Sequence, residues 1–246
     1  MGTRLVARGL DLSQDDPAVW NLVRPDDVFD LHQRDVAAGS DAVYSNTFGA
    51  NRVRLARFAR ETEVEAIIRS AVSLAREAVG SERFVIGDIG PSAVEDARAY
   101  REHAEILMDS GVDALILETH TVAQALLGLE HLRKLDPGVP ILVSLHFWPE
   151  PTRESLKQFE DLGASVIGAN CVLGVENSLE VCRNLHESTN LPLLIKPSGG
   201  LPNGPAESPE TFAAAVARWL TLGVRLFGGC CGTSEAHIEA MRKALA

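Results

Sequence analysis

The chain has 246 residues, 46% of them hydrophobic, and a formal net charge of −11 at pH 7. It can bury a substantial core, and no low-complexity stretch indicates disorder. The acidic balance, without a local cluster of Lys and Arg, disfavours binding to nucleic acid. No apolar run has the length of a membrane-spanning helix, and the amino terminus lacks the apolar segment of a secretory signal. We therefore expect a soluble cytoplasmic protein.

Short apolar runs recur along the chain and predict strands. They are rich in β-branched residues and almost continuously apolar, a pattern typical of strands that are buried on both faces of a parallel sheet. The seven runs are residues 41–47, 83–89, 113–118, 140–146, 164–171, 191–196 and 224–229.

Amphipathic stretches precede and separate these runs and predict helices. Thr121 and Ser234 are suitable N-caps, and several stretches end at glycine, as at Gly111. The alternation predicts an α/β barrel or a doubly wound sheet, and no Pro/Gly/Ser linker divides residues 1–246, so we expect one domain. The predicted helices are residues 17–39, 55–79, 93–109, 122–134, 153–162, 177–186, 209–222 and 235–246.

The number of strands is one short of a closed barrel. Such a barrel has eight strands, and only seven runs are visible. Residues 17–39, before the first run, have a helical pattern, so a missing strand would have to precede Met1.

Cysteines stand at two of the predicted strand ends. Cys171 ends the fifth run, and Cys230 and Cys231 follow the seventh. Because the carboxyl ends of parallel strands share one rim, these residues can converge. Three thiolates with an open fourth position are the arrangement of a catalytic zinc site. Zinc deprotonates a bound thiol, which favours alkyl transfer to sulfur.

Each cysteine motif also has a simpler interpretation. Cys171 alone would more often be a small buried hydrophobe. The Cys230–Cys231 pair could serve packing or form a strained vicinal disulfide. Their convergence at one rim favours a metal, whereas Cys182 lies within a helical pattern and is expected in the core.

With these cysteine motifs, the chain resembles the homocysteine S-methyltransferase family, which includes betaine–homocysteine methyltransferase and the homocysteine-binding module of cobalamin-dependent methionine synthase. The resemblance implies a (β/α)8 TIM-type barrel whose first strand is truncated or missing here. It implies zinc held by Cys171, Cys230 and Cys231, with homocysteine thiolate as the exchangeable ligand. The matching stretches, in the family's order, are MGTRL, LHQRDVAAGSDAVYSNTFGANRVRL, GDIGP, LILETHTVAQA, IGANC, KPSGGLPNGP and GGCCGTSEAHIEAM.

The resemblance also implies substrate contacts. Glu118 is expected to receive the substrate ammonium group, and Ser45 and Thr47 to contact its carboxylate. Asn170 and Asn203 are expected to line the pocket. The simpler interpretations are a structural ion pair for Glu118, turn capping for the two hydroxyls and ordinary turn formation for the two asparagines.

The chain departs from the family pattern in several places. The family has an Asp-Gly motif just before the residues matched here by Met1, Gly2 and Thr3, and this motif is expected to bind the ammonium and carboxylate end of homocysteine. The present sequence starts after that motif. Either the native chain is longer, or the barrel is open at an edge that another chain covers, as in a homo-oligomer. Asp88 stands where the family often has a small neutral residue, and Gly49 where some members have a tyrosine that can occupy the vacant position on zinc. His146, at a strand end, is either a fourth ligand or a hydrogen-bonded rim residue.

The expected function is zinc-dependent methyl transfer to the thiol of homocysteine or a close analogue, giving methionine. The donor is a small molecule such as S-methylmethionine, S-adenosylmethionine or a betaine, or a separate methyl-corrinoid protein. The alternative is a catalytically impaired zinc-binding or thiol-binding barrel that lacks productive substrate capture. A lyase or aldolase that uses Lys196 as a Schiff base would leave the three cysteines unexplained.

Overall fold

The computed structural model describes residues 1–92, 97–146, 150–200 and 206–245. A curled sheet of seven strands lies at its centre, and each strand pairs in parallel with the next strand of the chain. This sequential order excludes the doubly wound alternative, in which the strand order reverses. All seven predicted strands are present: β1 (Ala42–Tyr44), β2 (Phe84–Ile89), β3 (Ala114–His120), β4 (Ile141–Leu145), β5 (Val166–Leu173), β6 (Leu193–Ser198) and β7 (Val224–Phe227).

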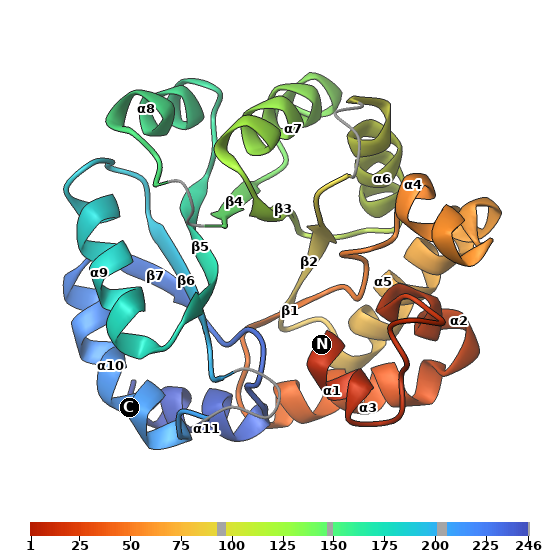
Figure 1. Ribbon diagram of the computed structural model, residues 1–246, viewed down its shortest axis with the longest axis horizontal. Helices are drawn as coiled ribbons and strands as arrows, with labels where there is room; N and C mark the ends of the chain where they lie inside the picture. The colour runs from red at the N-terminus through yellow and green to blue at the C-terminus, as the bar shows by residue number, and fades with distance from the viewer. Residues whose placement is uncertain (93–96, 147–149, 201–205, 246) are drawn as a thin grey trace.

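Helices surround the strands on the outside of the curled sheet (Figure 1). Short 3-10 helices cover Pro17–Val19, Ala56–Phe58 and Glu61–Glu63. None of the helices in the described residues is both long and apolar enough to cross a membrane. The α-helices are α1 (Gly2–Val6), α2 (Trp20–Val23), α3 (Pro25–Ala37), α4 (Arg52–Leu55), α5 (Val64–Val79), α6 (Ala97–Asp109), α7 (Val122–Leu135), α8 (Arg153–Asp161), α9 (Val175–His186), α10 (Pro209–Thr221) and α11 (Glu235–Lys243).

Successive side chains of each strand point to opposite faces of the sheet and form two separate apolar layers. The outer faces of the strands pack against the helices in one large cluster that includes Val85, Leu115 and Ile195. The inner faces form a smaller cluster inside the curl, made of Ile86, Ala114, Ile116, Leu142, Val166 and Leu194. Residues two positions further along these strands therefore also face inward, at the carboxyl end of the barrel.

The sheet is open between its first and last strands, whereas the ring of helices is closed. Within the described residues, β1 and β7 have no strand partner on their outer edges. Helices α3 and α11 nevertheless lie side by side (Figure 1). Arg4 of α1 joins them, since its guanidinium lies 2.6 Å from Asp35 and 3.0 Å from Glu235. The fold is a TIM-type barrel with one strand missing from the sheet, as expected.

Two helix predictions were wrong in their extent. The stretch 55–79 is a continuous helix only over α5, because Ala59 adopts a left-handed conformation with φ of 55° and interrupts the backbone hydrogen bonding. The stretch 17–39 breaks at Arg24, whose φ is −140°. Proline disfavours helical geometry in the residue before it, and Pro25 begins the next helix. The hydrophobic periodicity alone did not detect these breaks.

Packing at α10 holds the strand that leads to the second cysteine motif. Trp219 is completely buried, and its ring lies 5.9 Å from that of Phe227, at the end of β7. Its indole Nε1 donates to Ser178 Oγ at 3.0 Å, so its one polar atom is satisfied. Burial of a side chain of this size contributes at least about 2–3 kcal/mol. The end of β7 is thereby fixed against α9 and α10.

Candidate metal centre and its pocket

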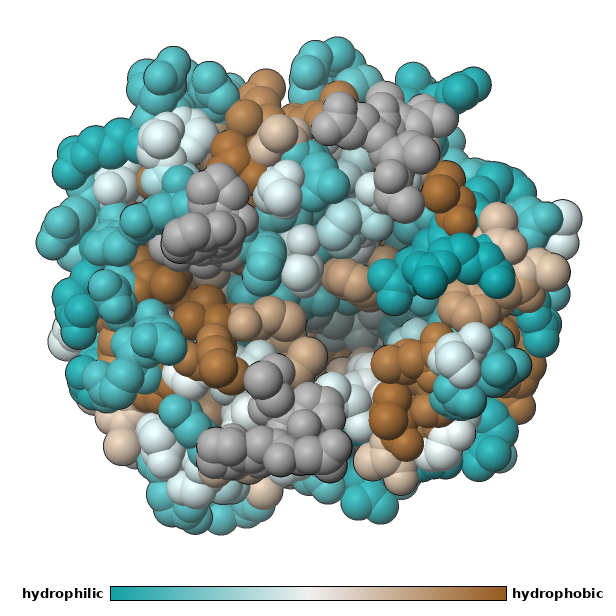
Figure 2. Space-filling model, in the orientation of Figure 1, coloured by the Kyte–Doolittle hydropathy of each residue, from teal (hydrophilic) through white to brown (hydrophobic). Residues whose placement is uncertain are grey.

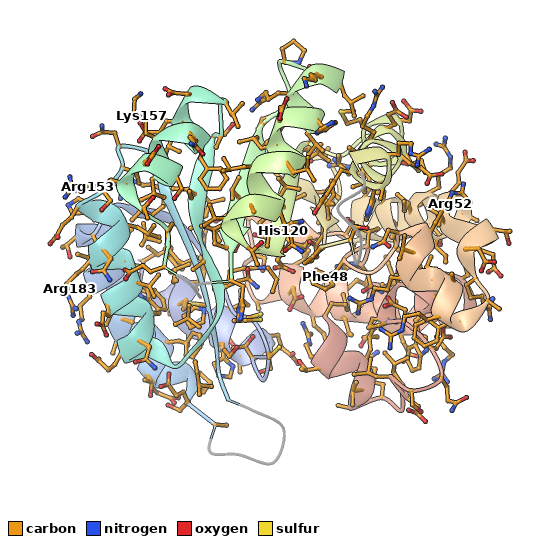
Figure 3. The ribbon with its side chains drawn as sticks, turned by 45° about the horizontal axis from the view of Figure 1, so that its top comes forward. Phe48, Arg52, His120, Arg153, Lys157 and Arg183 are labelled. Atoms are coloured by element: carbon orange, nitrogen blue, oxygen red, sulfur yellow. The ribbon has the colours of Figure 1, made fainter. Side chains whose placement is uncertain are left out.

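A cavity of about 950 Å³ occupies the inside of the curled sheet. It extends from the carboxyl ends of the strands to the unpaired edges of β1 and β7, and Figure 2 shows the hollow on this face. The wall at the carboxyl ends of the strands carries the polar and reactive groups Tyr44, Ser45, Asp88, Glu118, Lys196, Cys171, Cys230 and Cys231. Phe48, labelled in Figure 3, also lines it. The expected rim chemistry thus surrounds one space.

The structure brings together three of the four cysteines. The sulfur atoms of Cys171, Cys230 and Cys231 all lie within 4.8 Å of one another, and Cys171 Sγ is 2.9 Å from Cys230 Sγ. Two thiolates bonded to one zinc ion at about 2.3 Å lie about 3.8 Å apart in tetrahedral geometry. In the described part of the chain this is the one group of three or more His, Cys, Asp or Glu side chains that could hold an ion. A soft, all-sulfur donor set with this spacing fits zinc.

Unusual backbone geometry directs Cys171 toward the other two cysteines. Its φ is 57°, a left-handed value that is uncommon in residues other than glycine, and the pairing register of β5 and β6 shifts at this point. Thr119, at the end of β3, has φ of 61° with a similar shift. Strain of this kind persists where the surrounding structure holds it in place, and it is concentrated at functional sites.

Glycine precedes the adjacent cysteines for a steric reason. A Cβ atom on Gly229 would lie 2.2 Å from Thr233 Oγ1, which itself donates to the Cys230 carbonyl at 2.7 Å. A side chain at this position would therefore displace the turn that presents Cys230 and Cys231. A Cβ on Gly228 would meet only Lys196, at 3.9 Å, so the restriction applies to Gly229 alone.

Asn170 connects the first cysteine motif to neighbouring strand ends. Its Oδ1 accepts from the Thr119 backbone N–H at 3.1 Å and from Ser144 Oγ at 2.6 Å. Its Nδ2 donates to Thr119 Oγ1 at 2.7 Å and lies 3.9 Å from Cys230 Sγ. The amide is fully used inside the protein, so Asn170 holds the strained Thr119 segment and the cysteine cluster in one network. The sequence led us to expect Asn170 in the lining of the pocket, but it is not among the residues that line the cavity.

Contacts among the sulfur atoms favour one thiolate within the cluster. Hydrogen bonds with Cys171 and Cys231 lower the pKa of Cys230 well below its usual range, and the Lys196 ammonium lowers it further. The hydrogen bond to Cys230 raises the pKa of Cys171 in return. The cluster thus already concentrates negative charge, which a cation would stabilise.

A buried ion pair lies beside the cysteines. The Lys196 ammonium contacts Glu118 Oε1 and lies 3.8 Å from the centroid of the Tyr44 ring, and both charged side chains are 12% exposed. Burial lowers the pKa of Lys196, but attraction to Glu118, followed by Tyr44 and Cys230, raises it above its usual value. Lys196 is therefore a cation, which disfavours the Schiff-base role, because that role needs a neutral amine.

Ser45 and Thr47 are buried and engaged with the protein. Their hydroxyls lie 2.7 Å apart. Thr47 donates to the Asp88 carbonyl at 2.7 Å, and the Asp88 backbone N–H donates to Ser45 Oγ at 3.1 Å. This ties the end of β1 to the end of β2, and only Ser45 of the two lines the cavity. Their predicted contact with a substrate carboxylate stays a prediction.

The remaining expected residues lie elsewhere. Asn203 falls outside the described residues. His146 is exposed at the end of β4 and is not part of the cysteine group, so it is a rim residue and not a fourth ligand. Cys182 is completely buried in the core, as expected. His120, which Figure 3 labels near the middle of the molecule, is also completely buried, and its ring lies 5.6 Å from that of Tyr100.

Sequence analysis missed two residues that shape the site. Tyr44 covers the Lys196 ammonium, and Ser144 orients Asn170. Both lie on predicted strands, and the two-residue periodicity could have identified Tyr44 as inward-facing, because Ala42 packs on the inner apolar cluster.

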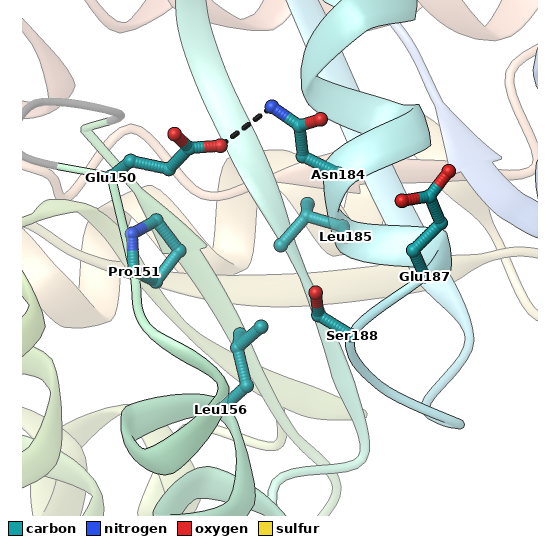
Figure 4. A pocket seen from close by; sticks show the side chains of 7 residues that line it. All are labelled: Glu150, Pro151, Leu156, Asn184, Leu185, Glu187 and Ser188. Atoms are coloured by element: carbon teal, nitrogen blue, oxygen red, sulfur yellow. Dashed lines mark hydrogen bonds between the residues drawn. The ribbon is translucent and has the colours of Figure 1, made fainter.

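A second, smaller pocket of about 240 Å³ lies away from the cysteines, between α8 and α9 (Figure 4). Glu150 accepts a hydrogen bond of 2.6 Å from Asn184 across it. Arg153, Lys157 and Arg183 on the same two helices are exposed, on the outer surface of the molecule (Figure 3). None of the residues that line this pocket is a cysteine or histidine, so it offers no comparable chemistry.

These features define a class: an open α/β barrel with a three-cysteine centre at the carboxyl ends of its strands. The chain belongs to the homocysteine S-methyltransferase family, whose model matches residues 1–245. It is 29% identical, over 290 aligned positions, to methionine synthase of Mycobacterium tuberculosis and, over 291, to that of Mycobacterium leprae. The alignments cover the whole of this chain and 24% of each relative.

A solved structure agrees in fold. The homocysteine methyltransferase MmuM of Escherichia coli, in its metallated form, superposes with a TM-score of 0.81 at 25% identity. The match covers 99% of this chain and 93% of that one. The barrel, the order of its elements and the family are thus established independently of the cysteine geometry.

Proposed function

We propose that the chain catalyses zinc-dependent transfer of a methyl group to the thiol of homocysteine, giving methionine. The observation that carries the proposal is the convergence of Cys171, Cys230 and Cys231 at the rim of a large cavity. Membership of the homocysteine S-methyltransferase family and the likeness to a metallated homocysteine methyltransferase support it. Three cysteines that lay apart in the core could not hold one metal ion together.

In this proposal the three cysteines hold the metal and leave one position for the substrate. A zinc ion bound there would ionise the substrate thiol at neutral pH. Glu118, fixed by Lys196, whose ammonium lies over the Tyr44 ring, contributes acceptor oxygens for the substrate ammonium. Ser45, on the same wall, would turn its hydroxyl from Thr47 Oγ1 to the substrate carboxylate when the substrate binds. Asn170 keeps the strand ends that carry these groups in register.

The proposal includes a small methyl donor or a separate methyl-corrinoid protein that reaches the cavity from the rim. The structure contains free cysteines, and reduced thiols are required for this chemistry, so a reducing compartment such as the cytoplasm is part of the proposal.

The test is methionine formation by zinc-loaded, reduced protein. Homocysteine is supplied with S-methylmethionine, S-adenosylmethionine, glycine betaine or methylcobalamin in parallel, and methionine is measured by mass spectrometry. We expect turnover with one donor class and none after zinc is removed with a chelator. Zinc and homocysteine binding without methionine from any donor would favour the catalytically impaired alternative, and failure of reduced, folded protein to bind zinc would reject both.

A further inference from the structure

Glu207 connects the two parts of the chain that carry the cysteines, and the proposed function gives it no role. It is half-buried and lies just before α10, which packs against both α9 and α11 (Figure 1). Helix α9 begins shortly after Cys171, and α11 begins shortly after Cys231. Glu207 makes hydrogen bonds toward each of these helices through different atoms.

The Glu207 carboxylate holds the segment that follows Cys171. Its Oε2 atom accepts a hydrogen bond of 2.9 Å from the backbone N–H of Val175, the first residue of α9. The N-cap of this helix is Gly174, which has no side chain to accept that bond itself. A carboxylate suits the place, because a helix amino terminus has free N–H groups and a partial positive charge. Only three residues separate Cys171 from Val175, so this contact fixes the chain where it leaves the first cysteine.

The Glu207 backbone holds the segment that contains Cys230 and Cys231. Its N–H donates to the Gly199 carbonyl at 2.6 Å, and the Gly199 N–H donates in turn to the Cys231 carbonyl at 2.8 Å. Its carbonyl accepts a hydrogen bond of 3.0 Å from His237 Nε2, on α11. One residue therefore ties both cysteine segments together.

His237 is fixed in one orientation at the start of α11. The Ser234 backbone N–H donates to its Nδ1 at 3.1 Å, so the ring proton is on Nε2, which donates to the Glu207 carbonyl. The ring is 7% exposed, and its centroid lies 5.0 Å from that of Phe212 in an edge-on contact. Since Ser234 is three residues after Cys231, the imidazole links the turn that follows the adjacent cysteines to Glu207.

The cysteine cluster needs support of this kind. Its three sulfur atoms lie within 4.8 Å of one another, and Cys171 has a strained backbone. Thiolates this close repel one another, so the surrounding chain must hold them together before a cation binds. Ligands that are already held in place bind a metal more tightly, because binding then costs less ordering of the chain.

We propose that Glu207 and His237 are positioning residues that hold the two cysteine segments in register for the metal. This inference rests on the proposed function, since it concerns the metal centre of that site. Neither residue belongs to the cysteine group. They act through hydrogen bonds that fix the backbone on both sides of the cluster.

The experiment measures metal binding by reduced protein in two ways. The zinc dissociation constant is obtained by competition with a chromophoric chelator, and the absorption bands of the cobalt(II)-substituted protein report the arrangement of the sulfur ligands. For Glu207→Ala we expect the zinc dissociation constant to rise about 10-fold, as for loss of a residue that supports metal ligands, and the cobalt bands to shift. Glu207→Gln should stay within about 3-fold of the unmodified protein, because its amide oxygen can still accept from Val175.

A second variant breaks the same connection from its other end. In His237→Asn the amide oxygen can still accept from the Ser234 N–H, but the shorter side chain cannot reach the Glu207 carbonyl. It should weaken zinc binding in the same direction, and it replaces Glu207→Ala if that variant does not fold. Glu176→Gln is the matched control, because Glu176 lies in the first turn of α9 and forms an exposed pair with Arg218. Its zinc dissociation constant should change less than about 2-fold.

Thermal melting separates a positioning role from a general contribution to stability. A lower melting temperature for Glu207→Ala with unchanged zinc affinity and cobalt bands would overturn the inference, and so would equal zinc loss in Glu176→Gln. Failure of the unmodified protein to bind zinc would reject the proposed function and this inference together. If the inference alone fails, the unmodified protein still binds zinc and forms methionine.

Discussion

Replacing Cys230 by alanine is expected to remove the metal and abolish methyl transfer while the protein stays folded. A zinc site of this kind binds with about 10–16 kcal/mol, so each of its ligands contributes about 3–4 kcal/mol, or roughly 200- to 1000-fold in affinity. Cys230 is half-buried on the barrel rim and is not part of the apolar core, so its loss leaves the core intact. The measurements are zinc per protein by mass spectrometry and the circular dichroism spectrum.

Cys182→Ala is the matched control for this prediction. Cys182 is completely buried among the apolar residues that pack α9 against the sheet, and burial raises the pKa of its thiol to about 12. The variant should keep its zinc and lose only about 1 kcal/mol of stability through a small cavity. Zinc retention by Cys230→Ala, or zinc loss by Cys182→Ala, would contradict the assignment of ligands.

Replacing Glu118 by glutamine is expected to lower the free energy of unfolding by about 2–3 kcal/mol, because it leaves the Lys196 ammonium buried without its closest partner. The cost should fall at or below the lower end of the usual range for a broken buried pair, since Asp88 still attracts Lys196. Urea denaturation near neutral pH measures the effect.

A double-mutant cycle separates the pair from its surroundings. The double variant Glu118→Gln/Lys196→Met should lose less free energy of unfolding than the two single variants lose in sum. The difference, which is the coupling energy, should be about 1–2 kcal/mol. Glu239→Gln, which breaks an exposed Lys243 pair on α11, should change stability by less than about 0.5 kcal/mol. Additive single changes would show that the Lys196–Glu118 contact does not stabilise the fold.

The sequence predicted the strands of this fold more reliably than the starts of its helices. Strands buried on both faces leave a continuous apolar signal, as in β4 and β6, and each strand end was found within a few residues. The helix boundaries depended on local backbone events that periodicity does not encode. Ala59 adopts a left-handed conformation that no glycine or proline announces.

The candidate site was predictable where chemistry alone identifies a residue. Cys171 and the Cys230–Cys231 pair stood out because strand ends must meet at one rim. The partners of Glu118 and Asn170 were not predictable, because Lys196 and Ser144 lie on other strands and contact them only after the sheet curls. The contacts of Glu207 likewise depend on which groups the folded chain brings to it.

X-ray absorption at the zinc K-edge, with and without homocysteine, tests most directly whether the metal and the acceptor sulfur meet at these cysteines. The zinc-loaded protein should show three sulfur neighbours and one lighter atom, and four sulfur neighbours after homocysteine is added. A coordination shell that homocysteine leaves unchanged, in protein that demonstrably binds it, would contradict direct activation of the thiol.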